Sequence, residues 1–217
     1  MARRTRVKIC GITRLNDAHV AQELGVDSLG FVFVPASSRY LPPKDAAEIT
    51  SQLSPFVNCV GLFLNATATE VRQALDICPG LLPQFHGQES AEYCDQFGRP
   101  YLKAIGVGSG MPAKGDLAAY RHASGFLFDS NEAGELGGTG HAFDWNILEH
   151  KIDKPLILAG GLNVQNVRQA IEQVAPHAVD VSTGVESAKG IKSEDAMREF
   201  MRAVNITDAA INATKQT

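Results

Sequence analysis

The sequence predicts an α/β fold in one domain, a closed (β/α)8 TIM barrel with eight parallel strands. Short apolar runs alternate with amphipathic stretches from one end of the chain to the other. The units recur at intervals of roughly 20–30 residues, which is too regular for chance and too long for a meander. A chain of 217 residues has the length at which a barrel forms one domain.

Alternating strands and helices imply a parallel sheet with right-handed crossovers, and eight such units close naturally into a barrel. A doubly wound sheet of eight strands is the structural alternative. We expect the barrel domain to span residues 1–205, followed by a polar, frayed C-terminal tail over residues 206–217.

The predicted strands are apolar runs that hold β-branched or aromatic residues and end near Gly, Pro, Ser or Asn, as buried parallel strands do. They are Arg6–Cys10, Ser28–Val34, Asn58–Leu64, Leu81–His86, Tyr101–Val107, Gly125–Ser130, Pro155–Ala159 and Ala178–Ser182.

The predicted helices lie between these runs. They are Asn16–Leu24, Lys44–Leu53, Ala68–Asp76, Ser90–Gln96, Trp145–Glu149, Val164–Val174 and Glu194–Val204, with a weakly marked one near Leu117–Arg121. Thr67 stands three residues before Glu70, the spacing of a capping box. Asn16 and Ser193 are further cap candidates at the start of helical runs.

The composition is that of an ordinary globular protein, with 44% hydrophobic and 20% charged residues. A formal net charge of −4 gives no electrostatic reason to expect nucleic acid or an anionic membrane as a partner. The apolar stretch after the N-terminal arginines is interrupted by Lys8, and no run approaches the roughly 20 apolar residues that span a bilayer. We therefore expect a cytoplasmic protein with no signal peptide.

The four cysteines lie far apart, with no C-x-x-C pair and no His pair at ligand spacing. This pattern argues against a structural zinc site and against a disulfide framework. We interpret Cys59, Cys78 and Cys94 as small buried apolar residues. Cys10 is different because it ends the first predicted strand.

Strands seven and eight are both followed by glycine-rich turns, Gly160-Gly161 and Ser182-Thr183-Gly184. Such turns let backbone N–H groups approach a ligand ahead of a helix N-terminus, which attracts phosphate. Barrel enzymes usually bind phosphate in these two loops. The sequence therefore predicts a phosphate site here, and the alternative is that the glycines only make tight turns.

Cys10 and Asp129 end strands one and six, on opposite sides of a barrel mouth, so a small sugar fits between them. A thiol acts as a base only as thiolate. Strand alternation places Lys8 beneath Cys10, where a buried cation would favour the thiolate. Asp180 shares a face with Ser182 and either pairs with Lys8 or reaches the substrate. Taken alone, Cys10 would be a core residue and Asp129 a cap or turn residue.

These segments resemble the phosphoribosylanthranilate isomerases of tryptophan biosynthesis, in family order from about Arg6 to Val204. The matching segments are Arg6–Thr13, Gly30–Phe33 with Ser37–Tyr40, Gln84–Gly87, Phe128–Ser130, Gly137–Gly140 with Phe143–Trp145, Leu158–Asn163 and Asp180–Ser187. The first and the last of them are the most specific.

The resemblance implies that Cys10 is the base, that Asp129 is the acid and that Arg39 holds the anthranilate carboxylate. A guanidinium suits a carboxylate held in two-point contact, although Arg39 alone would be a solvated loop cation. For His86, hydrogen bonding at the mouth and substrate contact remain open, because Pro83 and Phe85 depart from the family pattern around it.

The implied reaction is an Amadori rearrangement of phosphoribosylanthranilate, a small-molecule substrate, without a cofactor or metal, by a monomer or homodimer. One rival is the related isomerase of histidine biosynthesis, which resembles a two-aspartate design with Asp in place of Cys10. A lysine Schiff-base barrel would need a lysine at a strand end, and Lys8 is too deep. A barrel that only binds a sugar phosphate or acts as a scaffold would need no reactive pair.

Overall fold

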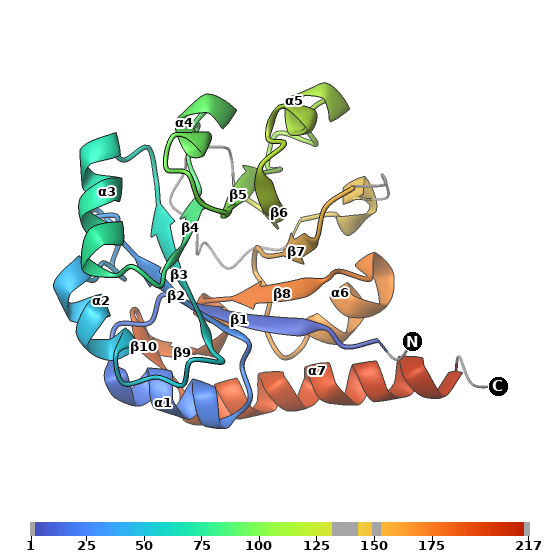
Figure 1. Ribbon diagram of the computed structural model, residues 1–217. Coiled ribbons are helices and arrows are strands. Elements are labelled where there is room, and N and C mark those ends of the chain that lie inside the picture. Colours follow the sequence, from blue (N-terminus) through green and yellow to red (C-terminus); the bar gives the residue numbers. More distant parts are fainter. Residues whose placement is uncertain (1–2, 132–142, 149–152, 215–217) are drawn as a thin grey trace.

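The computed structural model describes residues 3–131, 143–148 and 153–214, and these form a closed barrel of eight parallel strands (Figure 1). Neighbours in the chain pair in order, and β8 pairs with β1 to close the ring. The strands are β1 (Arg6–Cys10), β2 (Ser28–Val32), β3 (Asn58–Phe63), β4 (Leu82–Phe85), β5 (Tyr101–Gly106), β6 (Ala123–Asp129), β7 (Leu156–Leu158) and β8 (Ala178–Val181). The closed ring confirms the predicted barrel and excludes the doubly wound sheet.

Helices cover the outside of the barrel. They are α1 (Leu15–Glu23), α2 (Pro43–Thr50), α3 (Ala68–Ile77), α4 (Ala91–Asp95), α5 (Lys114–Ala119), α6 (Val167–Val174) and α7 (Glu194–Thr214). Between β6 and β7 the described residues hold a short 3₁₀ helix, Trp145–Leu148, at the place of the predicted helix Trp145–Glu149. Glu149 and the Gly137–Gly140 motif lie outside the described residues.

The expectation of a frayed tail from residue 206 is wrong, because α7 continues to Thr214. Thr207 and Asp208 are buried on this last part of the helix. The Asp208 carboxylate accepts hydrogen bonds from the backbone N–H and the hydroxyl of Thr5, just before β1. The polar composition of residues 206–217 did not indicate this contact, because a helix is ordered by the few residues on its buried face.

Helix capping follows the sequence in two of three places. Thr67 and Glu70 form the predicted capping box on α3. Ser193 accepts a hydrogen bond from the Ala196 N–H at 3.3 Å, as an N-cap does. The prediction for Asn16 is wrong, because α1 begins at Leu15 and Arg14 takes the cap position without a side-chain bond.

The barrel interior has an apolar end and a polar end. A cluster of apolar side chains fills part of the interior; its buried members are Val60, Leu102, Ala104, Leu127, Ile157, Ala159 and Ala178. Toward the carboxyl ends of the strands the buried residues become polar, namely Lys8, Gln84, Asp129 and Asp180. The main hydrophobic core lies between the strands and the helices and includes Phe31, Phe63, Phe85 and Phe128. The reactive groups therefore lie above a packed apolar floor.

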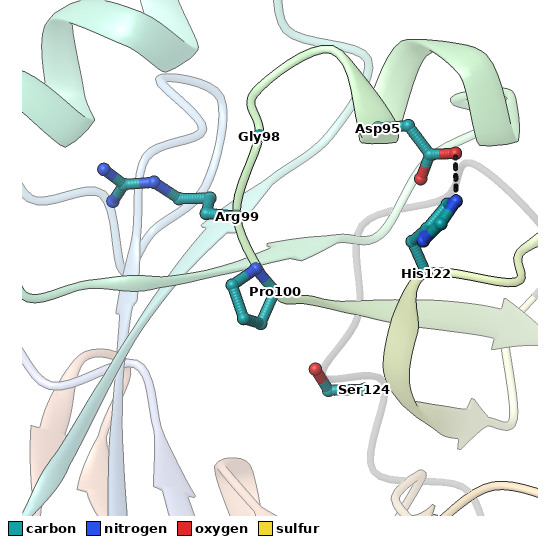
Figure 2. A pocket seen from close by; sticks show the side chains of 6 residues that line it. All are labelled: Asp95, Gly98, Arg99, Pro100, His122 and Ser124. Carbon is teal, nitrogen blue, oxygen red and sulfur yellow. Dashed lines mark ion pairs between the residues drawn. The ribbon is translucent and has the colours of Figure 1, made fainter.

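A surface pocket of about 430 Å³ lies at the other end of the barrel, where β5 and β6 begin (Figure 2). In this pocket His122 Nε2 lies 4.0 Å from Asp95 Oδ2. The lining residues are Asp95, Gly98, Arg99, Pro100, His122 and Ser124. Because barrel enzymes place their chemistry at the carboxyl ends of the strands, this pocket is not the active site.

Among the helices of the described residues, none combines the length and the apolar character needed to cross a membrane.

Candidate active site

Cys10 is the last residue of β1, and its side chain lies inside the barrel against β2. Its register partner there is Gly30, where an added Cβ would lie 2.8 Å from Cys10 Sγ and 3.2 Å from Lys8 Cε. Glycine at this position therefore leaves room for both side chains. Cys10 is 7% exposed and packs with Val32 and Val34 at the mouth. The predicted common face of Lys8 and Cys10 is confirmed.

Lys8 forms a buried ion pair with Asp180, with Nζ 2.8 Å from Oδ2. This confirms the first of the two roles expected for Asp180. Burial lowers the pKa of Lys8, but its interactions with Asp180 and Cys10 outweigh burial and raise the pKa above its ordinary value. Lys8 is therefore a cation. In the described part of the chain, the buried Oδ1 of Asp180 accepts no hydrogen bond, which leaves an acceptor inside the barrel.

Lys8 lowers the pKa of the Cys10 thiol, as expected of a cation beneath it. Burial raises that pKa by more than Lys8 lowers it, and the Asp180 charge raises it further, so the net shift is upward. Asp180 accepts a hydrogen bond from Lys8 and so offsets part of the effect of the cation. Without a ligand, Cys10 is a thiol at neutral pH.

Asp129 is the last residue of β6, 7% exposed, on the strand separated from β1 by β7 and β8. Its Oδ1 accepts hydrogen bonds from the backbone N–H of Asn131 at 3.1 Å and from the side-chain amide at 2.6 Å. Burial raises the pKa of Asp129 despite these bonds and despite Lys8, in the direction expected for an acid. Sequence reasoning missed Asn131, although an Asp-x-Asn turn signals such bonds.

The two glycine-rich loops touch each other and the end of β6. A Cβ on Gly160 would lie 2.5 Å from the Ser130 backbone nitrogen, and one on Gly184 would lie 2.1 Å from the Leu162 carbonyl oxygen. Gly160 and Gly161 also have positive φ angles of 81° and 64°. The glycines thus bring Asp129 and both loops together, whatever they bind.

The second loop directly precedes a helical turn, as predicted, and the first does not. The Ser182 hydroxyl donates to the Cys10 carbonyl at 3.0 Å, and the Thr183 hydroxyl accepts from Arg39 Nη2 at 3.2 Å. A 3₁₀ helix, Thr183–Val185, follows Ser182 directly. The pair Gly160-Gly161 does not directly precede its helix, because α6 begins only at Val167.

Arg39 is not a solvated loop cation, since it is only 8% exposed. Its stem lies over Gly11, where an added Cβ would come within 2.4 Å of Arg39 Cδ. The guanidinium makes two hydrogen bonds to Glu186, from Nε at 2.7 Å and from Nη2 at 2.8 Å. Lys192 Nζ lies 2.9 Å from the same carboxylate. No sequence pattern indicated that Glu186 and Lys192 are buried beside Arg39.

His86 follows β4 and is half-buried. Burial lowers its pKa to about 4, with help from Lys8 and Lys103, so the ring is neutral at neutral pH. Its Nδ1 lies 3.3 Å from Gln84 Nε2. Lys103 donates to the backbone carbonyls of Phe85 and Gly87, the residues before and after His86 in the chain. These contacts fix the ring at the mouth, and substrate contact remains a prediction.

The comparisons with known proteins agree on one family. The family model of N-(5'phosphoribosyl)anthranilate (PRA) isomerase matches residues 7–203. An N-(5'-phosphoribosyl)anthranilate isomerase from Azotobacter vinelandii is 50% identical over 199 residues, which cover 92% of this chain and 97% of the relative.

Two solved structures extend this similarity to the fold. Phosphoribosyl anthranilate isomerase from Thermus thermophilus has a TM-score of 0.83 at 35% identity, covering 93% of this chain and 99% of that one. Another phosphoribosyl anthranilate isomerase was solved in complex with reduced 1-(o-carboxyphenylamino)-1-deoxyribulose 5-phosphate. It has a TM-score of 0.79 at 37% identity and covers 93% of this chain and 98% of that one.

Proposed function

Because this chain belongs to the N-(5'-phosphoribosyl)anthranilate isomerase family, we propose that its barrel mouth carries out the isomerisation with Cys10 as general base and Asp129 as general acid. The enzyme catalyses the Amadori rearrangement of N-(5-phospho-β-D-ribosyl)anthranilate to 1-(2-carboxyphenylamino)-1-deoxy-D-ribulose 5-phosphate in tryptophan biosynthesis. The residue roles in this chain are the proposal.

The first step opens the ribose ring. Protonated Asp129 donates its proton to the ring oxygen, the C1–O bond breaks, and the nitrogen lone pair forms the C=N bond of a Schiff base. A carboxyl group that works as an acid near neutral pH needs a raised pKa, and the burial of Asp129 acts in that direction. This buried carboxyl, across the mouth from a buried thiol, is the observation that carries the proposal.

The second step forms an enolamine. Cys10 thiolate takes the proton from C2, the C–H electrons form a C1=C2 bond, and the C=N electrons return to nitrogen. The enolamine then becomes the ketone by loss of the C2 hydroxyl proton and protonation of C1. Lys8 lies beneath Cys10 and favours the thiolate once it forms.

The substrate phosphate belongs, in this proposal, at the backbone amides of the two touching loops. Gly160, Gly161 and Gly184 allow close approach, and Ser182 and Thr183 line the second loop with hydroxyls that already bond to Cys10 and Arg39. Binding at this remote group supplies energy that holds the reacting carbons between base and acid. In this proposal a ribose hydroxyl donates to Asp180 Oδ1, which accepts no hydrogen bond within the described residues.

Replacing Arg39 by alanine is expected to raise KM for phosphoribosylanthranilate about 10–100-fold, with a smaller change in kcat, because a charge-assisted contact to the carboxylate is lost. Consumption of the fluorescent substrate measures both constants. For an analogue that carries aniline in place of anthranilate, KM should rise far less. An equal rise in KM for the two substrates would show that Arg39 does not recognise the carboxylate.

The pH dependence of kcat/KM is expected to be bell-shaped. In the usual assignment the base sets the acid limb and the acid sets the alkaline limb, and here we expect the reverse. Active enzyme needs thiolate Cys10 and protonated Asp129, although the thiol has the higher pKa. Below the pKa of Asp129 both groups are protonated, and above the pKa of Cys10 both are ionised. Asp129 therefore sets the acid limb and Cys10 the alkaline limb.

Thiolate absorbance tests this assignment, as the difference between the enzyme and its Cys10→Ala variant across the pH range. The absorbance should rise where kcat/KM falls. An absorbance that rises together with the acid limb would contradict the assignment.

A Schiff-base lysine is a weaker candidate mechanism, because an attacking amine must be neutral and the ion pair with Asp180 keeps Lys8 protonated. The cytoplasmic location and the monomeric or homodimeric state remain predictions. Size-exclusion chromatography with light scattering measures the second.

A further inference from the structure

Glu186 is a buried carboxylate outside the catalytic pair, on the short strand β9 (Glu186–Ala188) that follows the β8 loop. Its side chain is 4% exposed and accepts hydrogen bonds from two cations. Arg39 contributes Nε and Nη2, at 2.7 and 2.8 Å, and Lys192 contributes Nζ at 2.9 Å. Burying three charges together is costly unless their geometry is good, which marks this cluster as a built feature.

We propose that Glu186 is the positioning residue for substrate carboxylate recognition, holding the Nε–Nη2 edge of Arg39 so that Nη1 is left to bind the anthranilate carboxylate. The proposal rests on the proposed role of Arg39. The two bonds to Glu186 fix the plane of the guanidinium, because a bidentate contact leaves it no free rotation. In residues 3–131, 143–148 and 153–214, Nη1 donates no hydrogen bond.

The surroundings hold Glu186 still on both sides. Lys192 lies on β10 (Ile191–Lys192), which pairs with β9 in a hairpin next to α1 (Figure 1). The Lys192 backbone N–H donates to Asp17 Oδ2 at 3.0 Å, and its Nζ donates to the Ser182 carbonyl at 3.1 Å. These two hydrogen bonds hold the hairpin against α1 and against the loop that follows β8. Glu186 thus presents a fixed acceptor to Arg39.

The same contacts place Arg39 beside the base. The Arg39 stem lies over Gly11, the residue after Cys10, and Arg39 Nη2 also donates to the Thr183 hydroxyl. A guanidinium held at three points before the substrate arrives loses little conformational entropy on binding. One guanidinium serves two carboxylates through different edges, so the substrate need not break the Glu186 pair.

Two substitutions separate geometry from charge. Glu186→Gln keeps the length of the side chain and removes its charge, and Glu186→Asp keeps the charge and withdraws it from Arg39. We expect each to raise KM for phosphoribosylanthranilate about tenfold, with kcat within about twofold, because either change frees the guanidinium. KM for the aniline analogue should stay within about twofold. Ser187→Ala, the next residue on β9 and exposed, is the matched control.

Thermal unfolding checks that the variants are folded, and Glu186→Asp carries the test if Glu186→Gln does not fold. An effect of Glu186→Gln alone would assign the role to charge and overturn the positioning proposal. A fall in KM for either variant would also overturn it, because Glu186 would then compete with the substrate for Arg39.

A double variant distinguishes the proposed role of Glu186 from the proposed role of Arg39, on which it rests. If Glu186 acts through Arg39, Arg39→Ala with Glu186→Gln should have the KM of Arg39→Ala alone, since the partner is already gone. Additive losses would overturn the role of Glu186 and leave Arg39 untouched. If Arg39→Ala raised KM equally for phosphoribosylanthranilate and for the aniline analogue, the proposed role of Arg39 itself would be wrong.

Discussion

Asp129→Asn is expected to lower kcat by about 10²–10⁴-fold with little change in KM, which is the size expected for loss of a general acid. The amide has nearly the shape of the carboxyl group but cannot deliver a proton to the ring oxygen. Its contacts with Asn131 persist because an amide oxygen also accepts hydrogen bonds. Steady-state kinetics with phosphoribosylanthranilate measures both constants.

Asp95→Asn is the matched control for this prediction. This substitution makes the same chemical change at the opposite end of the barrel, in the pocket drawn in Figure 2. Asp95 accepts a hydrogen bond there from the Tyr101 hydroxyl at 2.9 Å. That variant should keep turnover close to that of the parent enzyme. Near-normal turnover of Asp129→Asn would remove Asp129 from the mechanism.

Cys10→Ser is expected to lower kcat by a similar factor, about 10²–10⁴-fold, because a serine hydroxyl ionises far less readily than a thiol. The side chain keeps almost the same size, so its packing with Val32 and Val34 is retained. Substrate binding should change little, since neither the two glycine-rich loops nor Arg39 is altered. Initial rates with the same fluorescent substrate give the result.

Cys59→Ser provides the thiol control, because Cys59 lies half-buried on β3 outside the barrel mouth. This variant should turn over as the parent does. Unchanged activity of Cys10→Ser would instead assign Cys10 to packing alone.

Strand alternation made much of the site predictable. A period of two in a parallel strand fixes which residues point inward, so Lys8 under Cys10 and Asp180 beside it follow from the sequence once the strands are located. The positions of the carboxyl ends of β1 and β6 around the barrel likewise follow from the regular succession of eight strand–helix units. The positions of Cys10, Asp129 and Asp180 therefore needed no tertiary information.

Contacts between distant loops were not predictable. Glu186 lies 147 positions from Arg39 along the chain, and nothing in the local pattern says that the two are joined. The ionisation of Cys10 depends on a balance between burial, Lys8 and Asp180, and the sequence reveals the cation but not the extent of burial. The prediction for the end of α7 was wrong for the same reason, because Asp208 bonds to Thr5, which is far from it along the chain.

The pairing of β1 with β8 has a consequence for biosynthesis. On the ribosome β1 is made well before its partner β8 and before the helix that carries Asp208. One edge of β1 therefore stays open until β8 has left the exit tunnel, and open strand edges invite wrong partners. Nascent chains that end before β8 should thus be prone to aggregate.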